Sequence, residues 1–231
     1  MSRKLITIST IMTLMSTSVI ADVPNVAADI APIHSLVSRV MDGVGAPKLI
    51  VQSGASPHGY RLRPSEAKAL QDADHVFWMG EELTPWLDSA IDTLATKASV
   101  TTLLDQEGNI LHDIRKGALF EAHDHSAHGD DDHDDHDDHK DHDDHDDHGS
   151  HDPHAWLSPE NAKLWLNIIA SKLSVSDPEN AATYFMNAAA GQAEIEVMIA
   201  EVKATLKPVQ GGKFVVFHDA YQYFENDFDF Y

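Results

Sequence analysis

The chain has 231 residues, no cysteine and a formal net charge of −22 at pH 7 when histidine is counted as neutral. The lack of cysteine excludes disulfides, thiolate zinc sites, cysteine-linked haem and dithiol redox chemistry. Basic residues form no stripe beyond the extreme N-terminus, so we expect no binding to nucleic acid or to an anionic membrane surface.

Residues 1–21 have the pattern of a secretory signal peptide. Arg3 and Lys4 precede an apolar stretch over residues 5–20, and Ala21 ends the segment. This stretch is interrupted by polar residues, whereas a membrane-spanning helix needs about 20 predominantly apolar residues. We therefore expect cleavage, a Gram-negative periplasmic location and no membrane insertion of the mature chain. A membrane anchor that is retained uncleaved is the alternative.

Strands and helices are expected to alternate through the N-terminal half. Short apolar runs predict strands and longer amphipathic runs predict helices. The expected strands cover residues 23–30, 48–52, 74–79 and 100–104, and the expected helices cover residues 32–41, a segment that begins at Pro64, and 81–95. This alternation predicts the α/β class, with a parallel sheet flanked by helices.

Residues 123–151 carry ten histidines among thirteen acidic residues, in a repeat of the form His-Asp-Asp. The segment has too few apolar side chains to fold by itself, so we expect a disordered loop. Imidazole is a common ligand of transition metals, and this composition predicts low-affinity metal collection. A solvated loop without a specific role is the alternative. The collecting residues would be His123, His125, His128, His133, His136, His139, His142, His145, His148 and His151.

Two helices are expected after this loop. Ser158-Pro159-Glu160 is a typical helix start, with an N-cap residue followed by proline. A longer helix is expected from Asp177 to Lys207, about 30 residues, which is long enough to connect two lobes.

A strand is expected over residues 213–217, with His218 at its carboxyl end. His58 follows the expected strand 48–52 in the same sense. Ligand sites in parallel sheets lie beyond the carboxyl ends of the strands, so we expect both histidines to face one crevice. Asp219 is expected either to cap a following helix or to orient a ligand imidazole.

Three segments in order resemble a known family, the zinc-specific substrate-binding proteins of bacterial ABC uptake transporters (the ZnuA type). They are residues 54–65 (GASPHGYRLRPS), 152–159 (DPHAWLSP) and 217–224 (FHDAYQYF). The resemblance extends over residues 22–231, and an acidic His-rich insertion before the second segment is typical of zinc members.

The resemblance implies two α/β lobes joined by a long helix, with Zn²⁺ bound between them as the transported ligand and delivered to an ABC permease. It implies His58 and His154 as ligands from the first lobe and His218 as a ligand from the second. Three imidazoles suit zinc, whereas manganese prefers harder oxygen ligands. A periplasmic zinc chaperone is a possible further partner, and we expect a monomer.

The chain also departs from the family. Pro57 occupies a position where some zinc members have glutamate, so no carboxylate ligand comes from it. Members normally continue beyond the third segment, so we expect the second lobe to be incomplete in this chain.

These features predict four parts. They are a signal peptide (1–21), an N-terminal α/β lobe (22–174) that contains the His-rich loop (123–151), a connecting helix (175–207) and the start of a C-terminal lobe (208–231).

High-affinity zinc capture for import is the favoured function. The alternative is a periplasmic zinc buffer or metal chaperone that acts mainly through the His-rich loop. The chain lacks the His-Glu-x-x-His, Gly-x-Ser-x-Gly and Walker motifs, so we do not expect an enzyme.

Overall fold

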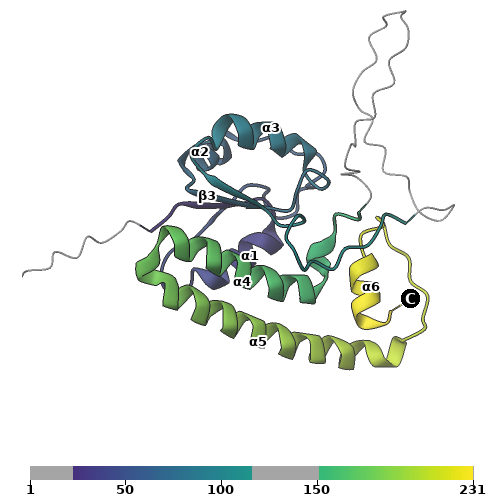
Figure 1. Cartoon of the computed structure of the whole chain (residues 1–231). Coiled ribbons are helices and arrows are strands. Elements are labelled where there is room, and N and C mark those ends of the chain that lie inside the picture. Colours follow the sequence, from purple (N-terminus) through teal and green to yellow (C-terminus); the bar gives the residue numbers. More distant parts are fainter. Residues whose placement is uncertain (1–22, 116–150, 231) are drawn as a thin grey trace, which may run out of the picture.

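The structure is a computed structural model that describes residues 23–115 and 151–230 (Figure 1). The expected signal peptide and most of the His-rich loop, residues 123–150, lie outside the described residues. None of the described helices is long and apolar enough to cross a bilayer.

A parallel sheet forms the centre of the fold, with strand order β2-β1-β3-β4. The two inner strands are buried along their whole length, as is usual when helices cover both faces of a sheet. The strands are β1 (Val26–Ala28), β2 (Lys48–Leu49), β3 (His75–Trp78) and β4 (Ser99–Thr102).

Helices cover both faces of this sheet (Figure 1). Because side chains alternate along a strand, Val26 and Phe77 pack into one apolar core with α1, α4 and α5. Ala27 and Val76 pack into a second core with α2 and α3. The helices are α1 (Ala31–Val40), α2 (Pro64–Asp72), α3 (Pro85–Leu94), α4 (Pro159–Ser176), α5 (Ala181–Leu206) and α6 (Gln222–Phe228), and the 3₁₀ turns are η1 (Ala155–Leu157), η2 (Pro178–Asn180) and η3 (Lys207–Val209).

The α/β class and the parallel sheet are confirmed, although each of the four N-terminal strands is shorter than or shifted from its expected range. The helix expected over 81–95 begins only at Pro85, because proline favours the first helical position. The four-part division of the chain stays a prediction.

The strand expected over residues 213–217 is wrong. These residues have no regular secondary structure, and Val215 and Phe217 are 99% and 104% exposed. A strand needs a neighbour for its backbone hydrogen bonds, and no described strand pairs with this segment. His218 therefore lies on an irregular connection.

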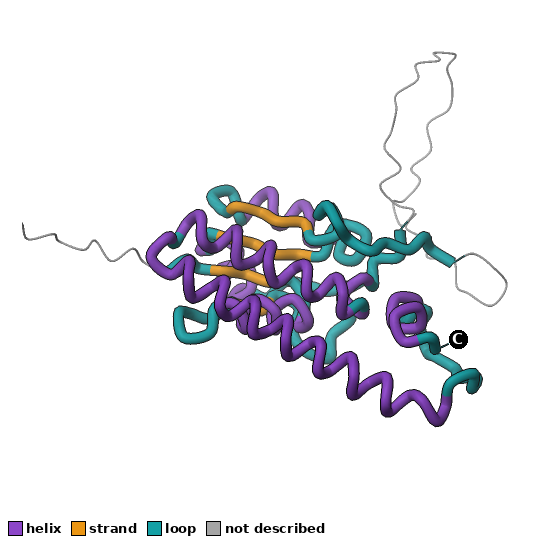
Figure 2. The backbone as a smooth tube through the Cα atoms, turned by 60° about the horizontal axis from the view of Figure 1, so that its bottom comes forward, coloured by secondary structure: helices purple, strands orange, loops and turns teal. Residues whose placement is uncertain are grey.

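The expected long helix is present as α5, preceded by the 3₁₀ turn η2. Its buried residues are Tyr184, Ala188 and Gly191, all in its first half, which packs against α4 and α1. Its second half runs on beyond the sheet toward α6, as Figure 2 shows. α5 thus carries the chain from the sheet-containing body to the segment that holds His218.

Asp29 is a fully buried carboxylate at the carboxyl end of β1. Its two oxygens accept hydrogen bonds from the backbone N–H groups of Ile30 (2.7 Å) and Met79 (2.8 Å), so it joins the ends of β1 and β3. Burial raises the pKa of Asp29 from its ordinary value of 3.8 to about 7, against the opposing effect of these hydrogen bonds.

We expect this carboxyl group to make stability depend on pH. Since its pKa is raised on folding, the folded state binds more protons between about pH 4 and pH 7. The contribution of Asp29 is therefore fully present below about pH 4 and is lost as the pH rises through about 7, at most by about 1.4 kcal/mol per pH unit. Urea unfolding of the wild type and of Asp29→Asn, both with chelator present, gives the free energy of unfolding of each protein. We expect the difference between these two free energies to change with pH. A difference that stays constant over this range would contradict the prediction.

Candidate metal centre

Three histidines from distant parts of the sequence converge at one place. His58 lies in the loop between β2 and α2, His154 directly precedes η1, and His218 lies between α5 and α6. The potential ligand atoms of these three residues all lie within 4.8 Å of one another. The ring centroids are 5.5 Å apart for His58 and His154, 5.3 Å for His58 and His218, and 5.0 Å for His154 and His218.

The three histidines of this cluster differ in their exposure to solvent. His154 is buried, His218 is half-buried and His58 is exposed. The cluster is therefore open to solvent on the side of His58, while His154 forms its inner wall. Within residues 23–115 and 151–230, this is the single group of three or more histidine or acidic side chains arranged closely enough to hold one ion.

The loop that carries His58 is held on both sides. Trp86 of α3 donates its indole N–H to the backbone oxygen of Pro57, the residue directly before His58, at 2.7 Å. Further along, Glu66 of α2 accepts hydrogen bonds from the hydroxyl of Tyr60 (2.8 Å) and from the backbone N–H of Arg63 (2.7 Å). The helix start at Pro64 and a partner from α3 thus fix an otherwise irregular loop.

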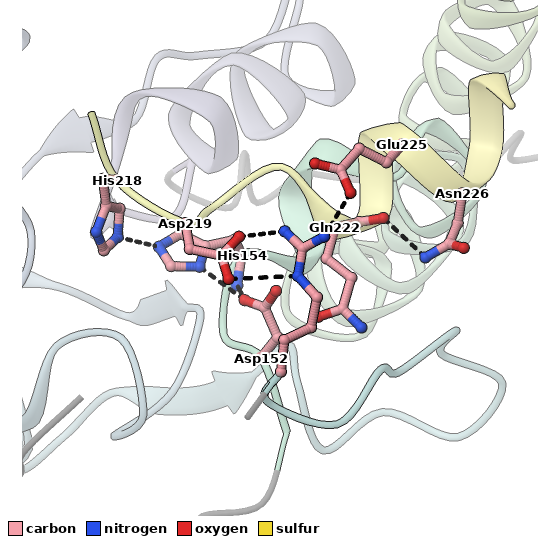
Figure 3. Close-up of polar contacts among 8 residues, drawn as sticks. Asp152, His154, His218, Asp219, Gln222, Glu225 and Asn226 are labelled. Atoms are coloured by element: carbon pink, nitrogen blue, oxygen red, sulfur yellow. Dashed lines mark hydrogen bonds and ion pairs between the residues drawn. The ribbon is translucent and has the colours of Figure 1, made fainter. Parts of the chain in front are cut away.

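His154 is oriented by a neighbouring carboxylate. Oδ1 of Asp152 lies 2.7 Å from Nδ1 of His154 and also accepts the His154 backbone N–H at 3.0 Å. With Nδ1 occupied in this way, Nε2 of His154 faces Nε2 of His218 at 3.1 Å (Figure 3). Sequence reasoning did not single out Asp152, although its spacing of two residues before the histidine permits this local contact.

Asp219 does not cap α6, and its role in orienting a ligand imidazole stays a prediction. Its carboxylate pairs with the guanidinium of Arg115, which also contacts Glu225 of α6. The N-cap residue of α6 is Tyr221, which makes no side-chain capping bond. Arg115 carries no motif signal in the sequence, so only the fold identifies it as a neighbour of the site.

Tyr223 of α6 ties the C-terminal segment to the rest of the site. Its hydroxyl donates to the backbone oxygen of Asp152 at 2.7 Å and accepts the backbone N–H of His112 at 3.2 Å. The side chain is fully buried within the core that α1, α4 and α5 share. This contact holds α6 beside the segment that carries His154.

His151 is the one described member of the expected collecting set. Its Nδ1 lies 3.0 Å from a carboxylate oxygen of Asp113, and the two residues form an isolated antiparallel bridge. It is not part of the three-histidine cluster. The other nine collecting histidines lie outside the described residues.

Chemically, the cluster offers three imidazole nitrogens and no carboxylate of its own. Neutral imidazole binds zinc and similar transition metals, and a tetrahedral site with three such ligands keeps its fourth position open for water or another ligand. Asp152 adds the carboxylate–histidine pairing that commonly orients ligands in metal sites.

Comparison with known proteins places this chain in a family. The model of the family described as "Zinc-uptake complex component A periplasmic" matches residues 26–231. The high-affinity zinc uptake system protein ZnuA of Brucella abortus (strain 2308) is 47% identical over 214 residues, which cover 88% of this chain and 64% of that protein. The corresponding protein of Paracoccus denitrificans (strain Pd 1222) is 46% identical over 207 residues, with the same coverage.

A solved structure agrees with the fold. The crystal structure of a zinc-bound deletion mutant of ZnuA superposes with a TM-score of 0.71 at 22% identity, over 90% of this chain and 68% of that chain. The chain spans 64% of the length of the two curated relatives above. With a family match that extends over nearly all described residues, the chain belongs to the family of periplasmic component A proteins of zinc-uptake complexes.

Proposed function

We propose that this chain captures zinc in the periplasm and delivers it to the permease of an ABC importer, with His58, His154 and His218 as the ligands of one ion. The observation that carries the proposal is the convergence of three imidazoles from three separate segments, with their ligand atoms within 4.8 Å of one another. Membership of a family of zinc-uptake components supports it.

The geometry of the cluster is compatible with one zinc ion. With a Zn–N distance of about 2.0–2.1 Å, the nitrogens of a tetrahedral site lie about 3.4 Å apart. The facing nitrogens of His154 and His218 are 3.1 Å apart, and the ligand atoms of all three histidines, including His58, lie within 4.8 Å of one another. Pro57 supplies no ligand atom, so water or a group outside this chain takes the fourth position.

The His-rich segment collects zinc and raises its concentration beside this site. Its two ends meet within the described residues, because Asp113 pairs with His151 and the Asp152 backbone N–H donates to the oxygen of His112 at 2.7 Å. His154 follows His151 by only three residues. Ions bound anywhere along the segment are thus tethered close to the three-histidine cluster.

The cellular setting belongs to the same proposal. Residues 1–21 act as a cleaved signal peptide, and the mature chain works in the periplasm as a monomer that a zinc chaperone can load. The protein binds and hands over its metal without chemical change, so it is no enzyme; membership of a family of uptake components supports this.

A zinc buffer is the second candidate, favoured by the number of histidines in residues 123–151. In that case the segment would hold nearly all the metal and the three-histidine cluster would be secondary. The two functions differ in where the tight site lies, so removal of the segment separates them.

The first prediction of the proposed function concerns His58. His58→Ala removes one of three ligands, so we expect zinc affinity of the tight site to fall by more than about 100-fold, since loss of an outer-shell partner alone costs about 10–100-fold. Competition with a chromophoric chelator measures this. His34→Ala is the matched control, because His34 lies on α1 and hydrogen-bonds the backbone oxygen of Pro47. Unchanged affinity in His58→Ala would contradict the proposed ligand set.

The second prediction concerns the His-rich segment. Since Asp113 and His151 already pair, a short glycine-serine linker can replace residues 116–150. We expect the shortened chain to keep one tight zinc site while its total zinc capacity falls. If the shortened chain loses both its tight zinc site and its capacity, the zinc-buffer function is favoured. Equilibrium dialysis measures the capacity, and chelator competition measures the tight site.

The third prediction concerns Asp152. Asp152→Asn removes the negative charge that orients His154, so we expect zinc affinity to fall by about 10–100-fold while the fold is retained. Asp74→Asn is the control, since Asp74 also accepts a backbone N–H, that of Asn25 at 2.8 Å, far from the cluster. If Asp152→Asn and Asp74→Asn bind zinc with equal affinity, Asp152 does not contribute to zinc binding.

A further inference from the structure

His218 reaches the cluster on an irregular segment, in which Phe214 stacks on Phe230, just after α6, with ring centroids 4.9 Å apart. Residues 212–221 have no helix or strand, and Val215 and Phe217 point almost entirely into solvent. The half of α5 that precedes the segment contributes no buried residue after Gly191. Burial of neighbouring side chains therefore does not explain why His218 lies opposite His154.

One guanidinium group contacts this segment directly beside His218. Arg115 contacts both carboxylate oxygens of Asp219, the residue directly after His218, through Nε at 3.3 Å and through Nη2. Its Nη1 donates to Glu225 of α6 at 2.5 Å. The side chains of all three residues are less than one quarter exposed, at 23%, 17% and 12%, so solvent screens these contacts less than it screens a surface pair.

Arg115 belongs to the part of the molecule that also carries His154. It lies three residues after His112, whose backbone oxygen accepts the N–H of Asp152, and Asp152 orients His154. Figure 3 shows Asp219, one of the two carboxylates that Arg115 contacts, beside the pair formed by His154 and His218. One side chain thus links the segment before the His-rich region to the residue that follows His218.

α6 has other attachments that do not involve Arg115. Tyr223 bonds the backbone of Asp152, and Asp227 accepts the hydroxyl of Ser158 at 2.6 Å. Loss of Arg115 should therefore leave α6 docked and release mainly the connection at Asp219. This separates a role in positioning His218 from a general role in folding.

We propose that Arg115 is a positioning residue for zinc binding, which holds Asp219 and thereby sets the His218 imidazole against His58 and His154. The inference rests on the proposed function of the three-histidine cluster. The planar guanidinium group of arginine can donate to two carboxylates at once in fixed directions, whereas lysine has a single ammonium group. A lysine at this position should hold the segment only in part.

The test uses the full chain and measures zinc affinity of the tight site by chelator competition. We expect Arg115→Ala to lower the affinity about 10–100-fold, and Arg115→Lys to lie between this variant and the wild type. Arg39→Ala is the matched control, because Arg39 makes a similar fork contact with Glu194, at 2.9 and 2.8 Å, between α1 and α5. We expect its zinc affinity to equal that of the wild type.

A double variant tests whether Arg115 affects zinc binding through His218 or by another route. If Arg115 acts through His218, Arg115→Ala adds no further loss of affinity in the His218→Ala background. The visible absorption of bound Co²⁺, which depends on the number and geometry of the ligands, should change in Arg115→Ala as it does in His218→Ala. Additive losses, or a Co²⁺ spectrum like that of the wild type, would overturn the proposal.

The remaining outcomes are also decisive. If Arg115→Ala and Arg39→Ala lose the same zinc affinity, the role of Arg115 is structural and the inference is overturned. The same holds if circular dichroism shows that both Arg115 variants are unfolded. If His58→Ala and His218→Ala keep tight zinc binding, the proposed function itself fails. If they lose it while Arg115→Ala does not, only the role of Arg115 is wrong.

Discussion

The buried hydroxyl of Tyr223 joins the parts of the molecule on which the site depends. It bonds the backbone at both His112 and Asp152, the residues that flank the His-rich segment, and it brings α6 with it. The three histidines come from segments far apart in the chain, so the cluster exists only while the C-terminal segment stays docked on the sheet-containing body. A fully buried aromatic side chain with both hydrogen-bonding capacities satisfied is well suited to this task.

Charge is arranged in layers around the cluster. The inner layer consists of imidazoles, while carboxylates lie one step further out, at Asp152 behind His154 and at Asp219 beside His218. Arg115 balances part of that negative charge and holds its position. A divalent cation among the imidazoles would be stabilised by the outer carboxylates without direct contact, and the carboxylate behind His154 would make that imidazole a stronger ligand.

The parallel sheet explains part of this arrangement. The chain leaves β2 toward the His58 loop at the carboxyl end of the strands, the usual place for a ligand site in such sheets. The side chain of Asp29 links the carboxyl ends of β1 and β3 at the same edge by hydrogen bonds. His218 does not follow a strand in the described structure, so the strand-end argument that pointed to it from the sequence had the wrong premise. Its place beside His154 comes instead from α6 and Arg115.

The sequence by itself determined the alternation of strands and helices, because apolar periodicity and proline positions are local signals. It also singled out the three histidines, because each lies in a short motif with recognisable neighbours. Only the tertiary structure decided the distances among them, the shorter strands, the irregular path of residues 213–217 and the roles of Asp152, Tyr223 and Arg115. These depend on contacts between residues as far apart in the sequence as His58 and His218, and periodicity along a chain carries no information about such pairs.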